Sequence, residues 1–127
     1  MTEFSEAAAT LPVADFERAK GFYGGTLGLS VVMDDEAGTL YKAGTAHVFV
    51  YPSEFAGSNK ATAATFVVAD TVAAVEELRG KGVTFEEYDM PGLKTENGIA
   101  ELGGAKGAWF KDTEGNILAL TEMPSPA

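Results

Sequence analysis

One seven-residue segment occurs twice in this chain, and this repetition restricts the fold more than any other feature. Residues 9–15 read Ala-Thr-Leu-Pro-Val-Ala-Asp and residues 64–70 read Ala-Thr-Phe-Val-Val-Ala-Asp, so five of seven residues are identical at an offset of 55. A helical pattern follows each Asp, and a glycine followed by a strand-like segment comes after each helix. Repetition at this length indicates two copies of one supersecondary unit.

Each copy is predicted to begin with a strand that leads into a helix. Asp15 and Asp70 suit the N-cap position, because an aspartate carboxylate accepts hydrogen bonds from the first free N–H groups of a helix. After each Asp, apolar residues recur at helical spacing and give the helix one face to bury. They are Phe16, Ala19, Phe22 and Tyr23 in the first copy and Val72, Val75 and Leu78 in the second. Glycines follow both segments, Gly24-Gly25 and Gly80 with Gly82, and are predicted to end the helices.

The rest of each copy is predicted to be strands, which gives the order βαβββ twice and an α+β fold class. The predicted strands are Gly28–Val32, Thr39–Lys42 and Ala46–Tyr51, then Thr84–Tyr88, Gly107–Lys111 and Asn116–Thr121. We predict a single domain over residues 1–127, with modules at about 6–52 and 62–123. Ser53–Ala61 is predicted to be a linker, and Met90–Gly98 a mobile loop.

The charge balance restricts the kinds of partner. Nine Lys and Arg against nineteen Asp and Glu give a formal net charge of −10, which repels nucleic acid phosphates and anionic lipid headgroups. We therefore expect no nucleic acid partner, no membrane partner, and a small-molecule ligand that is neutral or cationic. The absence of cysteine excludes disulfides, thiolate catalysis and zinc-thiolate sites.

The sequence also predicts a location. Residues 1–6 are acidic where a secretory leader would be basic, and no apolar leader core follows them. The longest strand-like apolar run, Val48–Tyr51, is too short to span a bilayer and stops at Pro52. We expect a cytoplasmic protein.

Four short motifs occur in a fixed order on this duplicated frame. They are Leu11-Pro12-Val13-Ala14-Asp15, then Arg18-Ala19 with Phe22-Tyr23, then Leu27-Gly28-Leu29, and finally Trp109-Phe110-Lys111-Asp112-Thr113-Glu114-Gly115-Asn116. Over nearly its whole length the chain resembles the vicinal oxygen chelate superfamily, which includes glyoxalase I, fosfomycin-resistance proteins, extradiol dioxygenases and bleomycin-binding proteins. The resemblance implies two βαβββ modules whose strands form a curled mixed sheet around a cavity, with helices outside. It implies no particular reaction.

Enzymes of this superfamily hold a divalent metal ion with His and Glu side chains from the first and last strands of each module. Carried over onto this sequence, the first-strand position falls on Ala8, its repeat partner on Ala63, and the position in the final strand on Ala119. The fourth position falls on Val50 or, in a second alignment, on Val48. Because methyl and isopropyl groups carry no donor atom, we expect no metal of the family type and no cofactor.

Other candidate catalytic groups are few. His47, the only histidine, lies near the start of a strand and is predicted to form a structural hydrogen bond rather than to act as a ligand or base. Glu122 lies three residues past the ligand position, so its side chain is predicted to point to the opposite face. The sequence has no nucleophile elbow and no phosphate-binding glycine motif. We assign no catalytic residue.

Strand alternation sorts the remaining side chains onto two faces. If the alanines at the ligand positions face the cavity, hydroxyl and aromatic side chains are expected beside them. The predicted ligand-binding residues are Thr10, Tyr41, Val50, Thr65, Tyr88, Trp109 and Thr121. The alternative is that large inward side chains, with Trp109, Tyr41, Phe49 and Tyr88 as candidates, fill the space and leave a packed core.

The leading hypothesis is a metal-independent small-molecule binding protein, a homodimer that sequesters a xenobiotic or antibiotic in the manner of a bleomycin-resistance protein. The ligand is expected to be partly aromatic. A rival hypothesis is an enzyme, a glyoxalase-like lyase or isomerase or a dioxygenase relative. It would use Tyr88, Asp89 or His47 as acid or base, or hold a metal with relocated ligands. A third hypothesis is an interaction module that binds no small molecule.

Overall fold

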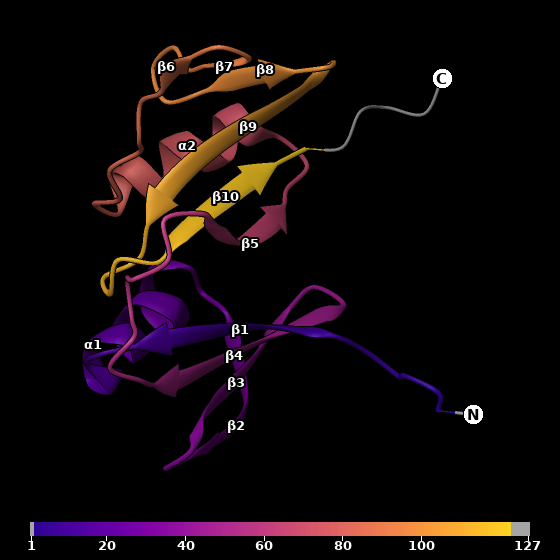
Figure 1. The fold of residues 1–127 in the computed structure, drawn as a ribbon, viewed down its shortest axis with the longest axis vertical. Coiled ribbons are helices and arrows are strands. Elements are labelled where there is room, and N and C mark those ends of the chain that lie inside the picture. The colour runs from indigo at the N-terminus through magenta and orange to yellow at the C-terminus, as the bar shows by residue number, and fades with distance from the viewer. Residues whose placement is uncertain (1, 123–127) are drawn as a thin grey trace. The chain divides into compact units, whose positions relative to one another are not determined.

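The computed structural model describes residues 2–122, with the backbone alone at Leu102. Its elements are β1 (Ala8–Val13), α1 (Phe16–Lys20), the π-helical turn η1 (Gly21–Thr26), β2 (Ser30–Asp35), β3 (Gly38–Ala43), β4 (Ala46–Pro52), β5 (Thr62–Val67), α2 (Thr71–Gly80), β6 (Asp89–Met90), β7 (Leu93–Lys94), β8 (Ala100–Leu102), β9 (Ala105–Lys111) and β10 (Ile117–Thr121) (Figure 1). Eight of these strands form two four-stranded mixed sheets accompanied by few helices, and β6 and β7 pair as a two-stranded sheet. The predicted α+β class is confirmed.

The chain divides into two compact units. The first unit extends to Ala63 and also contains the turn Asp112–Asn116, and the second contains Ala64–Lys111 and the chain from Ile117 onward. The turn therefore joins the first unit although it lies between two strands of the second. The turn carries two buried carboxylates, those of Asp112 and Glu114.

The sheet of the first unit has the strand order β1-β4-β3-β2. β1 pairs in parallel with β4, which requires the helical crossover between them, and the other two pairings are antiparallel. A β-bulge interrupts the β2–β3 register between Val31 and Met33. β2 ends the order and therefore forms one edge of the sheet.

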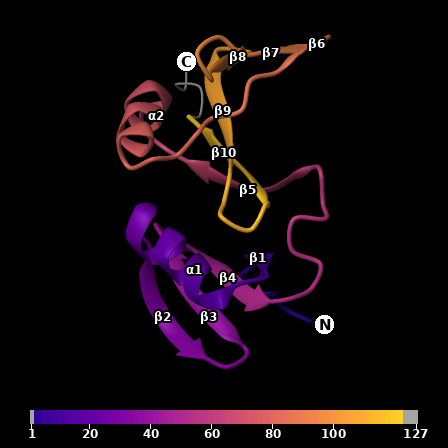
Figure 2. The ribbon, with the colours of Figure 1, turned by 90° about the vertical axis from the view of Figure 1, so that its left-hand side faces the viewer.

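The sheet of the second unit has the matching order β5-β10-β9-β8. β9 pairs in antiparallel fashion with β10 and with β8, and a short hairpin, β6–β7, precedes β8 in the chain. α2 contacts β9 and β10 and lies on one side of this sheet (Figure 2). The two sheets thus repeat one topology, as the sequence repeat predicts.

Both predicted N-caps are confirmed. The Asp15 carboxylate accepts a hydrogen bond from Arg18 N at 3.0 Å, and the Asp70 carboxylate accepts one from Ala73 N at 3.1 Å. Each satisfies one of the N–H groups that the first helical turn leaves without a backbone acceptor.

The first helix buries the face that its apolar spacing predicts. Ala19, Phe22 and Tyr23 are buried. The predicted stop at Gly24-Gly25 is wrong, because the chain continues there as the π-helical turn and Leu27 N donates to Phe22 O. Glycine, with no side chain, accommodates this wider turn without steric cost.

The second helix buries a slightly different face from the predicted one. Val75 is buried as expected, but Val72 is 37% exposed. Thr71 takes the buried position instead, and its hydroxyl donates to the Lys106 carbonyl at 2.9 Å. The buried face of the second helix therefore includes a hydrogen-bonded threonine in place of the predicted Val72.

The predicted strand Thr84–Tyr88 is wrong. Within it, only Phe85 forms a bridge, to Phe110. The Tyr88 carbonyl then accepts a hydrogen bond from Thr95 N, and Tyr88 N donates to the Thr95 hydroxyl. The following segment, predicted as a loop, contains the β6–β7 hairpin, and β8 was not predicted at all. These elements are two or three residues long, which is too short for alternation to reveal them.

None of the helices within residues 2–122 has the length and apolar character needed to cross a membrane.

Candidate functional site

Cross-strand partners share one face of a sheet, so the registers divide the side chains of the first unit into two sets. One row joins Leu11, Val50 and Thr39, and the next joins Val48 and Tyr41. All five are buried. The ring of Tyr23, from η1, lies 6.1 Å from that of Tyr41, so this is the face that the helical segment covers.

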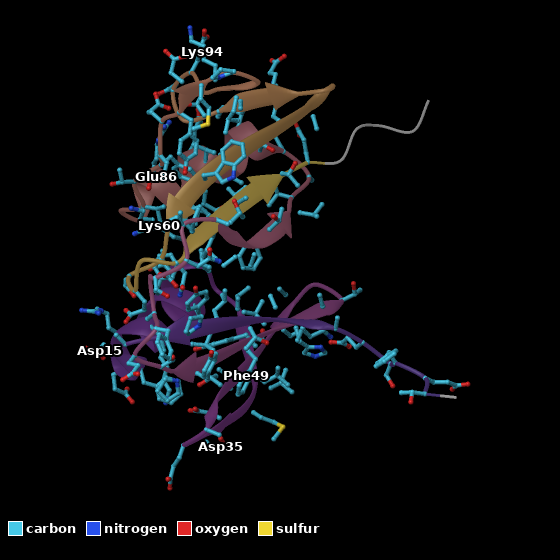
Figure 3. The ribbon with its side chains drawn as sticks, viewed as in Figure 1. Asp15, Asp35, Phe49, Lys60, Glu86 and Lys94 are labelled. Carbon is cyan, nitrogen blue, oxygen red and sulfur yellow. The ribbon has the colours of Figure 1, made fainter. Side chains whose placement is uncertain are left out.

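The opposite face of the same sheet, here called the far face of the first unit, carries aromatic and aliphatic side chains. Its central row joins Thr10, Phe49, Leu40 and Met33. Phe49 and Tyr51 stack, with ring centroids 6.1 Å apart and planes within 6°. Figure 3 labels Phe49 among the side chains of this sheet. Phe49, Leu40 and Tyr51 are half-buried, and Met33 is 60% exposed. The far face therefore offers a partly accessible apolar surface with a stacked aromatic pair at its centre.

The predicted residues of the first unit divide between these faces. Thr10 lies on the far face and is exposed. Tyr41 and Val50 lie on the covered face, with 1% and 0% exposure, so their side chains pack the core and burial raises the pKa of Tyr41. The prediction placed β3 and β4 one residue out of phase, and a shift of one residue moves every side chain to the other face.

The second unit has the same two faces. Phe110 pairs with Leu118 and Ala108 with Leu120, all buried, and Phe85 extends this set with its ring 5.4 Å from that of Phe110. The Arg79 guanidinium of α2 lies 5.5 Å from the Phe85 ring centre. This is therefore the helix side of the second sheet.

Trp109 marks the far face of the second unit. It pairs with Ala119, and its half-buried ring meets Tyr88 edge to face, with centroids 5.6 Å apart and planes at 76°. Lys111 follows on the same side by alternation and forms an ion pair of 3.5 Å with Glu86. This far face thus combines an aromatic pair with a charged pair.

The predicted ligand residues of the second unit are brought together in part. Tyr88 and Trp109 are in contact, and Thr121 shares the face of Ala119 by alternation. The Thr121 hydroxyl donates to backbone carbonyls at 3.4 Å. Thr65 is exposed on β5.

The strand registers show which residue of the first unit corresponds to Ala119, one of the positions where family enzymes hold a metal. Ala119 pairs with Trp109, and the corresponding pair in the first unit is Phe49 with Leu40. The fourth position is therefore Phe49, and Val48 and Val50 were the wrong choices. A phenyl ring carries no donor atom either, so this set of side chains does not fit a divalent cation. Across residues 2–122, no group of three or more His, Asp or Glu side chains is placed to hold a metal ion.

His47 lies on the far face of the first unit, in the row that joins Ala8 and Lys42. Its Nδ1 forms a close contact with Glu6 Oε1, which agrees with the predicted hydrogen-bonding role. A histidine beside a carboxylate is also the minimal arrangement for proton transfer, and it stands at the border of the apolar surface.

The turn Asp112–Asn116 carries two buried carboxylates that the sequence analysis did not single out. Glu114 Oε1 accepts hydrogen bonds from the backbone N–H groups of Ala14 and Asp15, at 3.0 and 2.8 Å, and Arg18 donates to both Glu114 oxygens. Burial alone would raise the pKa of Glu114, but the hydrogen bonds from Arg18, Thr113 and Asp15 outweigh it and lower the pKa to about 2.

Asp112 forms the second buried group of the turn. Its carboxylate accepts hydrogen bonds from the Tyr23 hydroxyl at 2.5 Å and from the side-chain and backbone N–H groups of Asn116 at 2.8 Å. Burial, followed by the neighbouring Asp112 charge, raises the pKa of Tyr23. Both carboxylates are fully engaged within the first unit, so we regard the turn as a structural clamp and not as a ligand site.

The sequence analysis named Phe49 only as a candidate cavity-filling side chain, and it did not name Tyr51 or Leu40 as members of the far face. A signal for Phe49 lies in the strand pairs. When Tyr41–Tyr51 and Phe110–Leu120 are aligned by their strand pairs rather than by one fixed offset, Phe49 becomes the repeat equivalent of Ala119. The repeat offset is 69 between β3 and β9 but 70 between β4 and β10.

Residues 7–120 match the Glyoxalase/Bleomycin resistance protein/Dioxygenase superfamily. No curated protein matches the chain.

Several solved structures share the fold. UcmS2 has a TM-score of 0.75 at 20% identity, covering 94% of this chain and 98% of its own. TnmS3, an antibiotic binding protein from Streptomyces sp. CB03234, has a TM-score of 0.72 at 22% identity, covering 98% and 99%. Lactoylglutathione lyase from Agrobacterium tumefaciens has a TM-score of 0.69 at 15% identity, covering 95% and 96%. At these identities the similarity concerns the fold alone.

Proposed function

The chain belongs to the Glyoxalase/Bleomycin resistance protein/Dioxygenase superfamily, and within it we propose a metal-independent small-molecule binding protein that sequesters a xenobiotic or antibiotic. The proposed ligand is neutral or cationic and partly aromatic. Each unit is proposed to offer its own contacts. They are Thr10, Phe49 and Tyr51 on the far face of the first unit, and Thr65, Tyr88, Trp109 and Thr121 in the second unit taken by itself.

The observation that carries the proposal is the stacked pair of Phe49 and Tyr51 on a face that no helix of its unit covers. Half-buried aromatic rings with few polar neighbours are typical of surfaces that bind flat organic molecules. Tyr88 and Trp109 provide a comparable pair in the second unit. Their electron-rich faces also attract cations, in agreement with the net charge of −10.

The residues at the metal positions support a mechanism of binding without a metal. Ala8, Ala63, Ala119 and Phe49 offer neither nitrogen nor oxygen donors, so a ligand would have to be held by stacking, apolar contact and hydroxyl groups. One solved structure with the same fold is an antibiotic binding protein, which supports sequestration as the biological purpose. A cytoplasmic location and a homodimeric state also belong to this proposal.

A thermal-shift screen would test binding. Matched aromatic compounds with positive, zero and negative charge would be compared, and binders confirmed by quenching of Trp109, the single tryptophan. We expect cationic and neutral compounds to raise the melting temperature and anionic ones to have little effect. A screen in which no aromatic compound shifts the melting temperature would contradict the proposal.

A pair of matched variants would assign the surface. Phe49→Leu removes one stacked ring, and we expect affinity for the best compound to fall about tenfold, the loss of roughly 1.4 kcal/mol of stacking. Phe55→Leu makes the same change at a residue that is 67% exposed and outside the sheet, and it should leave affinity unchanged. Equal effects of the two variants would place the ligand elsewhere.

The second candidate function is a glyoxalase-like enzyme, and the contact between His47 and Glu6 favours it. Elemental analysis of purified protein, after incubation with Mn, Fe, Co, Ni and Zn salts and desalting, separates the two. Near-zero metal agrees with the binding protein. About one metal ion per chain, together with turnover that His47→Ala abolishes, would favour the enzyme.

A further inference from the structure

A tight hairpin turn in the second unit has Asn97 and Gly98 at its centre. Glu96 and Ile99 flank them, form an antiparallel bridge and exchange backbone hydrogen bonds of 2.8 and 3.1 Å. Asn97 and Gly98 both have positive φ, 55° and 81°, which is typical of a type I′ turn. Among residues 2–122, Asn97 is the only non-glycine residue with positive φ. The turn thus depends on two residues that tolerate a left-handed backbone.

This geometry favours the pair of asparagine and glycine. Asparagine adopts the left-handed backbone more readily than most residues, because its short amide side chain hydrogen-bonds locally. A Cβ at Gly98 would lie 2.7 Å from Arg79 Nη2 and 3.1 Å from Phe85 Cβ, so a side chain would have to displace its neighbours. The chain has three asparagines, and glycine follows only Asn97. The fold therefore uses its one Asn-Gly dipeptide at this turn.

An asparagine side chain followed by glycine is open to attack by its own backbone. The Gly98 nitrogen loses its proton and bonds to Asn97 Cγ, and the side-chain nitrogen leaves as ammonia, which closes a succinimide ring. Water then opens the ring at either carbonyl and yields aspartate or isoaspartate, in which the main chain runs through Cγ. Glycine favours the attack because no side chain shields its nitrogen. The reaction needs no oxidant, reductant or cofactor.

Two side chains hold the peptide group between Asn97 and Gly98. Arg79 Nη2, from α2, donates to the Asn97 carbonyl at 2.7 Å, and Gly98 N donates to the Glu87 carboxylate. This carbonyl and this N–H belong to one peptide plane, so the two hydrogen bonds fix the plane from opposite sides. Asn97 is exposed and Gly98 is buried. Water therefore reaches the reacting side chain while the attacking nitrogen is held.

We propose that Asn97-Gly98 is a site of spontaneous deamidation, and that the hydrogen bonds to Arg79 and Glu87 set its rate. Attack requires Gly98 N to release Glu87 and approach Asn97 Cγ, so the reaction proceeds from an opened turn. The rate then tracks the population of the open form, because a turn recloses far faster than the new bond forms. Isoaspartate lengthens the backbone by one methylene and prevents the flanking bridge from forming again. The modification thus limits the lifetime of the intact hairpin.

Peptide mapping of the aged whole chain would test the site. Purified protein is incubated at neutral pH, folded or in concentrated urea. Mass spectrometry then measures conversion of each asparagine to acid, and enzymatic methylation detects isoaspartate. We expect modification at Asn97 and little at Asn59 or Asn116, which precede lysine and isoleucine. The folded chain should react at least about tenfold more slowly than the unfolded chain, because two hydrogen bonds keep the peptide group in place.

Matched variants would test the two hydrogen bonds. Glu87→Ala removes the acceptor of Gly98 N and should speed deamidation of the folded chain about fivefold, the effect of one hydrogen bond on the opening equilibrium. Arg79→Ala should act in the same direction. Glu87→Gln keeps an acceptor oxygen and should stay within about twofold of the unaltered chain. Glu76→Ala, at an exposed residue of α2, is the control and should have no effect.

Three results would overturn the proposal. They are an Asn97 that stays intact in the unfolded chain, equal rates in the folded and unfolded chain, and variants Glu87→Ala and Arg79→Ala that react no faster than the unaltered chain while their circular dichroism matches it. Because no ligand is involved, these outcomes are independent of the proposed function. Asn97→Gly keeps a residue that suits positive φ and should abolish isoaspartate. Isoaspartate that persists in this variant would also overturn the assignment.

Discussion

Replacing Glu114 by glutamine removes one charge from the buried clamp and leaves its shape. The Glu114 side chain has no solvent exposure, whereas the Arg18 side chain that it contacts is 53% exposed. Glutamine can still accept from the backbone N–H groups of Ala14 and Asp15 through one oxygen, but its NH2 group then faces the Arg18 guanidinium. We expect Glu114→Gln to fold and to be less stable than the unaltered chain.

The magnitude follows from linkage between protonation and folding. Glu114 has a pKa of about 2 in the folded chain against an ordinary value of 4.5. Because the folded pKa is depressed, the carboxylate stabilises the fold fully above pH 4.5, and this stabilisation is lost as the pH falls toward 2. The shift corresponds to about 3.4 kcal/mol at neutral pH, about 1.4 at pH 3 and about 0.4 at pH 2. Solvent screening at the half-exposed Arg18 lowers the neutral value to about 2 kcal/mol.

Urea unfolding, followed by far-UV circular dichroism at pH 7, 5, 4 and 3, would measure the difference between the two chains. We expect a gap of about 2 kcal/mol at pH 7 that narrows to below about 1 at pH 3. Glu54→Gln, the same change at an exposed residue of the same unit, is the control and should shift stability by less than about 0.5 kcal/mol. A gap that is absent at pH 7, or that does not narrow with acid, would refute the reasoning.

Three further predictions concern stability and share the same urea assay. Tyr23→Phe deletes the 2.5 Å hydrogen bond to Asp112 and should cost about 1–3 kcal/mol, because a buried carboxylate loses a donor; an unchanged midpoint would contradict this. Asp70→Ala deletes the N-cap of α2 and should cost about 1 kcal/mol, while Asp70→Asn should restore most of it. Gly38→Ala would place a Cβ 2.5 Å from the Val50 carbonyl oxygen and 2.6 Å from the Phe49 ring, so it should cost about 2 kcal/mol or more.

The parts of the fold that sequence predicted are those in which several local signals agree. Asp15 and Asp70 combine capping chemistry with a repeated strand before them and a periodic helix after them, and both caps are present. The hairpin at Asp89–Lys94 had no such support, because each of its strands is two residues long and pairs only Asp89 with Lys94 and Met90 with Leu93, which is too short for an alternating pattern.

For the first sheet, the sequence did not show which side chains lie on which face. The sequence indicated aromatic side chains, hydroxyl groups and non-ligating metal positions, yet it assigned Tyr41 and Val50 to the wrong side of their sheet. β3 and β4 are apolar on both faces, with Leu40 and Tyr41 adjacent and Val48, Phe49 and Val50 in a run. In such a run, alternation does not show which side chains face the helix. The pairing with β1 does, because it places Val50 beside the buried Leu11 and Phe49 beside the exposed Thr10.

The turn at Asp112–Asn116 has a consequence for the order in which the chain can fold. The strands of the first unit are synthesised first, but their buried carboxylates arrive only after residues 64–111. Joining Glu114 to Ala14 closes a segment of 100 residues, which costs about 4 kcal/mol of chain entropy. Such distant contacts slow folding, so the unit that begins to form first on the ribosome cannot be completed until residues 112–116 have been synthesised.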